Sequence, residues 1–149
     1  MLLFRYKYPG FLLFACLSFL INCTPARVLP KNYKGEQLHF GQGGGFSGII
    51  THYALLDNGL LFQKEYRDTN FIAAASWEKG FVKQMFQNYH QLERDKLDHY
   101  HPGNLYYFIE YHKTGEPVHR ISWGESGYTP GDHIISFYNL LYRSTKSKS

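Results

Sequence analysis

The sequence predicts an α+β domain in which a single antiparallel β-sheet of four to five strands carries two helices on one face. Two groups of strand-like segments are each followed by an apolar stripe of helical spacing, in the order β-β-β-α-β-β-α. Placing both helices on one side of the sheet buries all of these apolar stripes in two layers. A content of 44% hydrophobic and 18% aromatic residues suits a packed core.

The first group of strands is arranged around a strong turn signal. Gln37–Phe40 is a short strand candidate, and Ile49–Leu56 is rich in β-branched and aromatic residues. The turn is predicted at Asp57-Asn58-Gly59, because glycine readily adopts the positive φ of a tight hairpin. Leu60–Tyr66 then returns as the partner strand.

A helix is predicted after Ser76, which is a suitable N-cap, with Glu78 in the first turn. Its apolar stripe consists of Trp77, Phe81, Met85 and Tyr89, with Val82 and Phe86 beside them.

A second hairpin is predicted from Leu105–His112 and Val118–Trp123, joined by the turn at residues 113–117. Thr129 and Pro130 are then the expected N-cap and first residue of the last helix. The core-facing residues of that helix are expected to be Ile134, Ile135, Tyr138 and Leu141.

The N-terminal residues have the pattern of a secretory signal peptide. Residues 1–10 carry two positive charges, Arg5 and Lys7, and no negative charge. The apolar run Phe11–Ile21 follows, and its eleven residues are fewer than the roughly 20 that a membrane-spanning helix needs. We therefore expect export and removal of this segment.

The run ends in Leu20-Ile21-Asn22-Cys23, which resembles the lipobox of bacterial lipoproteins, although Asn22 stands where Ala, Gly or Ser is commoner. The resemblance implies cleavage between Asn22 and Cys23 and lipid attachment to Cys23. The protein would then be anchored to a membrane of the bacterial cell envelope, at the outer membrane or the cell surface. Cys16 is an alternative site of modification, but it would leave a very short apolar region before it.

The chain thus divides into four predicted parts. Residues 1–22 are the signal peptide, and residues 23–35 are the lipid-anchored cysteine and a flexible tether with two prolines. Residues 36–143 form the α+β domain, and residues 144–149 are a disordered basic tail. Both cysteines precede the domain, which excludes a disulfide or a thiolate metal site within it.

Charge argues against a nucleic-acid partner. The chain has 16 basic and 12 acidic residues, and removing Arg5 and Lys7 with the signal peptide leaves 14 against 12, a net charge of +2. Nucleic-acid-binding domains usually show a clustered basic surface, which this composition does not provide.

The most unusual stretch of the predicted domain is Gly43-Gly44-Gly45-Phe46-Ser47-Gly48. It lacks the Lys-Ser/Thr pair of a phosphate-binding P-loop, and strand-like residues rather than a helix follow it. We interpret it as a candidate recognition loop, with a bulged connection between strands as the alternative.

The histidines do not predict a metal site. His99 and His101 would place two imidazoles on one side of an extended segment, with Asp95 or Asp98 nearby, but no third ligand follows from the spacing. A set of strand histidines is expected on the solvent face, namely His52, His112 and His119. We therefore expect no metal and no other cofactor.

No catalytic constellation is recognisable either. Ser47 lacks the surrounding pattern of a nucleophile elbow, and Glu110 is expected on the face of its strand opposite Tyr107 and Ile109. We therefore expect a non-enzymatic protein. Several aromatic residues exceed what a small core buries with ease, and they predict either an exposed contact face or unusually tight packing: Tyr106, Phe108, Tyr111, Trp123 and Tyr128.

Three motifs together resemble the emfourin (protealysin-inhibitor) type of small α+β domain. They are Gly-Gly-Phe-Ser-Gly at residues 44–48, Tyr-Tyr-Phe-Ile-Glu at 106–110 and His-Arg-Ile-Ser-Trp at 119–123. The resemblance covers residues 38–143 and implies inhibition of a secreted thermolysin-like metallopeptidase. The leading expectation is a lipid-anchored protein with a non-enzymatic binding or envelope role, and such a peptidase inhibitor is the alternative.

Overall fold

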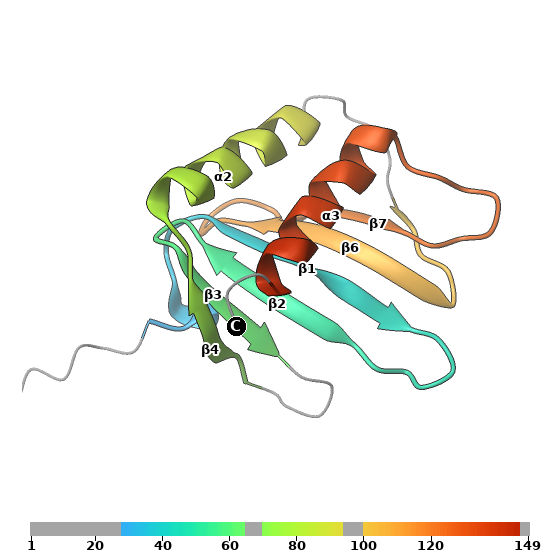
Figure 1. Ribbon diagram of the computed structural model, residues 1–149, viewed down its shortest axis with the longest axis horizontal. Helices are drawn as coiled ribbons and strands as arrows, with labels where there is room; N and C mark the ends of the chain where they lie inside the picture. The colour runs from blue at the N-terminus through green and yellow to red at the C-terminus, as the bar shows by residue number, and fades with distance from the viewer. Residues whose placement is uncertain (1–27, 65–69, 94–99, 147–149) are drawn as a thin grey trace, which may run out of the picture.

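In the computed structural model, residues 28–64, 70–93 and 100–146 are described, and they form one sheet with two helices over one of its faces (Figure 1). The sheet has seven strands in the order β4-β3-β2-β1-β6-β7-β5. The predicted α+β class, with one sheet and two helices on the same face, is confirmed.

The elements of the described residues have the following bounds. The strands are β1 (Gln37–Gly44), β2 (Thr51–Leu56), β3 (Leu60–Lys64), β4 (Ile72–Ser76), β5 (Tyr100–His101), β6 (Leu105–His112) and β7 (His119–Trp123). The helices are the short 3₁₀ segment η2 (Pro30–Asn32), α2 (Lys79–Glu93) and α3 (Asp132–Lys146).

The prediction of four to five antiparallel strands was wrong in two respects. Two strands were not expected, β4 and β5, and β5 pairs with β7 in parallel. In the sequence of β4, Ile-Ala-Ala-Ala-Ser, apolar and polar residues do not alternate and Ile72 is the one residue of high strand propensity, while β5 has only two residues. Their pairing with other strands of the sheet, β3 for β4 and β7 for β5, therefore determines their conformation.

β1 is the central strand and extends further than the predicted Gln37–Phe40. It pairs with β2 on one side and with β6 along its whole length on the other, as far as Gly44 opposite Leu105. Gly41 is required by this pairing, because a Cβ atom there would lie 1.9 Å from the carbonyl oxygen of Thr51. The glycine run thus begins inside the sheet.

The main core lies between the helices and the sheet. Tyr89 of α2 stacks on Tyr111 of β6, with ring centroids 5.3 Å apart, and Trp123 of β7 meets the edge of Tyr138 of α3 at 5.2 Å. Phe108, Tyr111 and Trp123 are all buried. For these three aromatic residues, tight packing rather than an exposed aromatic face is therefore the correct interpretation.

Both helices begin later than predicted. Ser76 is the last residue of β4, and the Glu78 carboxylate accepts hydrogen bonds from the backbone N–H groups of Gly80 (3.0 Å) and Phe81 (3.4 Å). Glu78 therefore satisfies the free N–H groups at the start of α2 in place of Ser76. α3 begins at Asp132, after Pro130, and continues to Lys146.

A smaller apolar cluster covers one end of the open face, which is the face of the sheet opposite the helices. Leu29 and Tyr33, which flank η2, pack there against Ala54, Leu56 and Phe62. Part of the segment expected as a tether thus lies against the sheet. The predicted signal peptide, Asn22, Cys23 and the end of the basic tail lie outside the described residues. Within 28–64, 70–93 and 100–146, no helix is long and apolar enough to cross a membrane.

Candidate functional site

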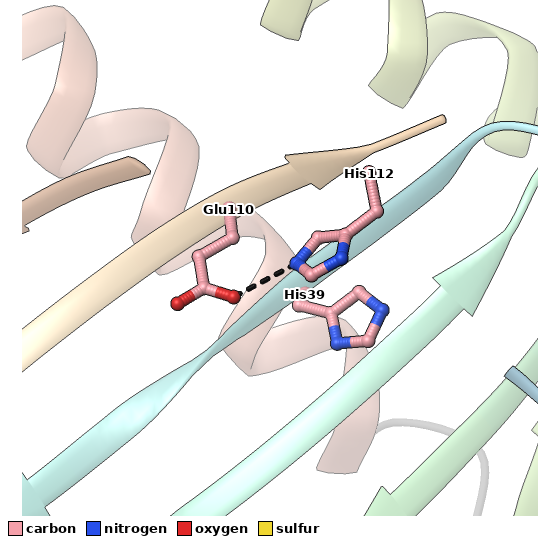
Figure 2. A group of neighbouring side chains, drawn as sticks. All are labelled: His39, Glu110 and His112. Carbon is pink, nitrogen blue, oxygen red and sulfur yellow. Dashed lines mark hydrogen bonds and ion pairs between the residues drawn. The ribbon is translucent and has the colours of Figure 1, made fainter. Parts of the chain in front are cut away.

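Three histidines and a glutamate from adjacent strands meet on the open face. His39 of β1 lies directly opposite Glu110 of β6, and His112 lies two residues further along β6. His52 of β2 is the diagonal neighbour on the other side, since it pairs with Gly41. Figure 2 shows His39 beside the pair formed by Glu110 and His112. We call these four residues the histidine cluster.

The side chains of the histidine cluster are in direct contact. His39 Nδ1 lies 3.0 Å from His52 Nε2, and the His39 ring stacks on the His112 ring with centroids 4.1 Å apart. His112 Nε2 lies 2.9 Å from Glu110 Oε2, and Arg120 holds the other oxygen of Glu110 at 2.9 Å. One nitrogen or oxygen atom from each of His39, Glu110 and His112 lies within 4.8 Å of the other two.

Burial keeps two of these imidazoles neutral near pH 7. His39 is only 7% exposed, and Phe71 covers it edge-on. This burial, together with the neighbouring imidazoles, lowers the pKa of His39 well below 6.5. Burial is also the main reason why the pKa of His52 falls to about 4.

Glu110 is ionised despite its position. Burial acts to raise the pKa of its carboxyl group, but the hydrogen bond from His112 and the positive charge of Arg120 outweigh this effect and hold the pKa below its usual value. The histidine cluster therefore combines two neutral imidazoles, those of His39 and His52, with an anionic carboxylate.

A pocket of about 300 Å³ borders the histidine cluster and opens it to solvent. His39, His112 and Phe71 contribute to its wall, and Tyr33 and Val118 line it further out. A small ion or a polar group can therefore approach the two imidazoles from this side.

The strand histidines were only partly predicted. His52 and His112 do lie on the face opposite the helices, but they are half-buried rather than solvated. The placement of His119 was wrong, because its ring bonds to the hydroxyl group of Tyr89 on the helix side of the sheet. His39 was not among the predicted site residues, although its position between two apolar residues, Leu38 and Phe40, both buried in the structure, is a signal for the open face.

Of the two histidines considered for a metal site, the structure describes only His101, and it lies outside the histidine cluster. His101 pairs with Glu125 at 3.1 Å and stacks on Tyr128. His99 lies outside the described residues, as do Asp95 and Asp98.

The predicted recognition loop forms the tip of the hairpin between β1 and β2. Gly44 and Gly45 have positive φ, and Gly45 N–H donates to the carbonyl oxygen of Asn104 at 2.8 Å. Phe46 is completely exposed, and Ile49 (55%) and Ile50 (38%) are exposed beside it. Residues 41–51, which include Gly43, Ser47 and Gly48, carry no charged side chain. We call residues 45–50 the hairpin tip.

No protein-family model matches the chain, and no curated protein is significantly similar to it. The roles of the histidine cluster and of the hairpin tip are therefore inferred from their geometry and chemistry alone.

Proposed function

We propose that the mature protein is a lipid-anchored, non-enzymatic binding protein of the bacterial cell envelope, which contacts a protein partner through the hairpin tip. The observation that carries this proposal is the complete exposure of Phe46 at the end of an ordered hairpin. Aromatic side chains, phenylalanine included, are enriched at protein–protein interfaces relative to the rest of the protein surface. Burying Phe46, Ile49 and Ile50 against a partner removes their apolar surface from water.

The position of the hairpin tip supports a role in contact away from the membrane. The chain enters the sheet at η2, at the opposite end of β1 from the tip (Figure 1). The eight residues of β1 span about 26 Å at roughly 3.3 Å per residue. Between Cys23 and Val28 the chain reaches at most about 18 Å. With Cys23 in the membrane, the η2 end faces the lipid and the tip points outward.

The exposure of Phe46 gives a prediction with a matched control. Phe46→Ala is expected to change the free energy of unfolding by less than about 1 kcal/mol, because the side chain makes little contact with the domain. Val118→Ala is the control, since Val118 is also exposed (55%) but lies in the turn between β6 and β7, at the η2 end of the sheet. Urea unfolding of the two variants checks this.

Partner binding can be tested at the same two positions, 46 and 118. A photo-crosslinking residue at position 46 is expected to give a discrete adduct in intact cells, and one at position 118 is not. Identical adduct patterns at the two positions, or none at position 46, would contradict the proposal. A loss of about 3–5 kcal/mol of stability in Phe46→Ala would instead assign Phe46 to the core.

Peptidase inhibition is a second candidate function, and the protruding Phe46 favours it. A single exposed aromatic side chain on a narrow tip is able to enter the cleft of a secreted thermolysin-like metallopeptidase. We expect stoichiometric inhibition of such an enzyme, weakened at least tenfold by Phe46→Ala and unchanged by Val118→Ala. Full peptidase activity at excess protein would eliminate this candidate and leave the crosslinking result unaffected.

A further inference from the structure

The protonation of His39 is set by its neighbours. Gln37 Nε2 donates to the carbonyl oxygen of Pro30 at 3.0 Å, and a carbonyl oxygen only accepts. Gln37 Oε1 is therefore the atom that faces His39 Nε2, at 3.1 Å, so His39 Nε2 carries the proton and donates it. The lone pair of His39 Nδ1 is left directed at His52 Nε2, 3.0 Å away.

This arrangement is the one found around metal-binding histidines. A histidine ligand usually donates its second ring N–H to a carbonyl or carboxylate oxygen, which fixes the tautomer and the ring orientation. Gln37 does this for His39, and Gln37 is itself held by the carbonyl oxygen of Pro30. In the metal-free protein, His52 Nε2–H donates to the free lone pair. A cation that replaces this proton would bind both nitrogens.

Only small movements of the side chains are needed to bring the ligand atoms to bonding distance from one metal ion. The three ligand atoms lie within 4.8 Å of one another, so even at that upper limit they are no more than about 2.8 Å (4.8/√3) from a common centre, and zinc bonds to nitrogen and oxygen are about 2.0–2.2 Å long. The ligand atoms of His39, Glu110 and His112 would therefore each need to move by at most about 0.7 Å. The stacked ring of His112 must also turn about its Cβ–Cγ bond, a torsion with broad minima, and the pocket beside it provides the space.

We propose that His39, His52, Glu110 and His112 bind one divalent first-row transition-metal ion, with zinc as the best match. Three imidazole nitrogens and one carboxylate oxygen form a donor set that zinc accepts, and zinc imposes no strong geometric preference. Arg120 would remain on the second oxygen of Glu110 and orient the carboxylate. This proposal is independent of the function proposed for the hairpin tip, and it replaces the sequence-based expectation of no metal.

The test is a zinc titration of the chain from Thr24 onward, which contains every described element and no cysteine. After removal of metals with a chelator, we expect one zinc ion per chain by native mass spectrometry, with a Kd of about 1 μM or below. Zinc at 100 times the Kd should raise the Tm by several degrees. In long-range ¹H–¹⁵N spectra of the wild-type histidines, His39 Nδ1 and His52 Nε2 should shift together.

Two variants and one control test the ligands. His52→Gln keeps an N–H donor for His39 but removes an imidazole, and His112→Asn removes a second one. Both should weaken zinc binding at least tenfold, while the control His101→Gln, outside the histidine cluster, should bind like the wild type. No binding at 100 μM zinc, or zinc-dependent shifts at other histidines and not at His39 and His52, would overturn the proposal. The spectra of the wild type decide the matter if a variant fails to fold.

Discussion

Replacing Cys23 with alanine is expected to abolish membrane attachment. Each buried methylene of a lipid chain contributes about 0.8 kcal/mol, and stable anchoring needs two or more chains. Within the described residues, no helix offers an alternative way of crossing the bilayer. The Cys23→Ala protein should therefore appear in the soluble fraction, or accumulate as unprocessed precursor. Cell fractionation combined with labelling by a fatty-acid analogue measures both outcomes.

Cys16→Ala is the matched control, because Cys16 also lies in the predicted leader but ahead of the expected cleavage site. It should leave processing, labelling and membrane retention unchanged. Normal retention of the Cys23→Ala protein would remove the lipoprotein assignment. If only the Cys16→Ala protein were released from the membrane, Cys16 would be the lipid-modified residue.

The second large effect is a loss of stability of the metal-free domain between pH 6.5 and pH 4. The pKa of His52 falls from 6.5 to about 4 on folding, so the unfolded chain binds more protons in this window. Stability therefore decreases as the pH falls, by roughly 3 kcal/mol for His52, at about 1.4 kcal/mol per pH unit. The lowered pKa of His39 acts in the same direction.

Most of the charges around His52 also favour a loss of stability as the pH falls. Lys64 and Arg120 oppose protonation of His52, and only Glu110 favours it, to a smaller extent than burial disfavours it. Well above pH 6.5, His39 and His52 are neutral in both the folded and the unfolded state, and their contribution to stability is constant. Below about pH 4.5, protonation of Glu110, whose pKa is lowered, removes further stability.

Urea unfolding at pH 7.5 and pH 4.5, in the presence of a chelator, measures this effect. His52→Phe places an apolar ring against Phe71 and Phe108 and should reduce the pH dependence by roughly 3 kcal/mol. His101→Phe, on a histidine outside the cluster, should leave it unchanged. Equal pH dependence in the wild type and the His52→Phe variant would show that His52 is not buried as described.

The local parts of the fold were predictable from the sequence, and the non-local parts were not. The turn at Asp57-Asn58-Gly59 is confirmed, because Gly59 has positive φ and its N–H bonds to the carbonyl oxygen of Leu56. The apolar stripes of the two helices are buried as expected, except that Phe81 and Ile135 are only partly buried. β4 carries no such local pattern, and only its pairing with β3 makes it a strand.

The histidine cluster could not be predicted from local sequence patterns for the same reason. His39 and Glu110 are 71 positions apart and meet only because β1 pairs with β6 in one particular register. A shift of that register by one residue would turn one of the two strands over and separate them. Alternation along β6 did place Glu110 on the face opposite Tyr107 and Ile109, but it could not supply its neighbours.

The β1–β2 hairpin contains positions that tolerate substitution and glycine positions that do not. Gly41 and Gly44 lie where a Cβ atom would meet a backbone oxygen at 1.9 Å, so substitution there should be selected against in any descendant that keeps the fold. Phe46 and Ile49 touch little of the domain and are free to diverge. Related proteins would then keep the glycine framework and change these two side chains, so that partner choice evolves without loss of the scaffold.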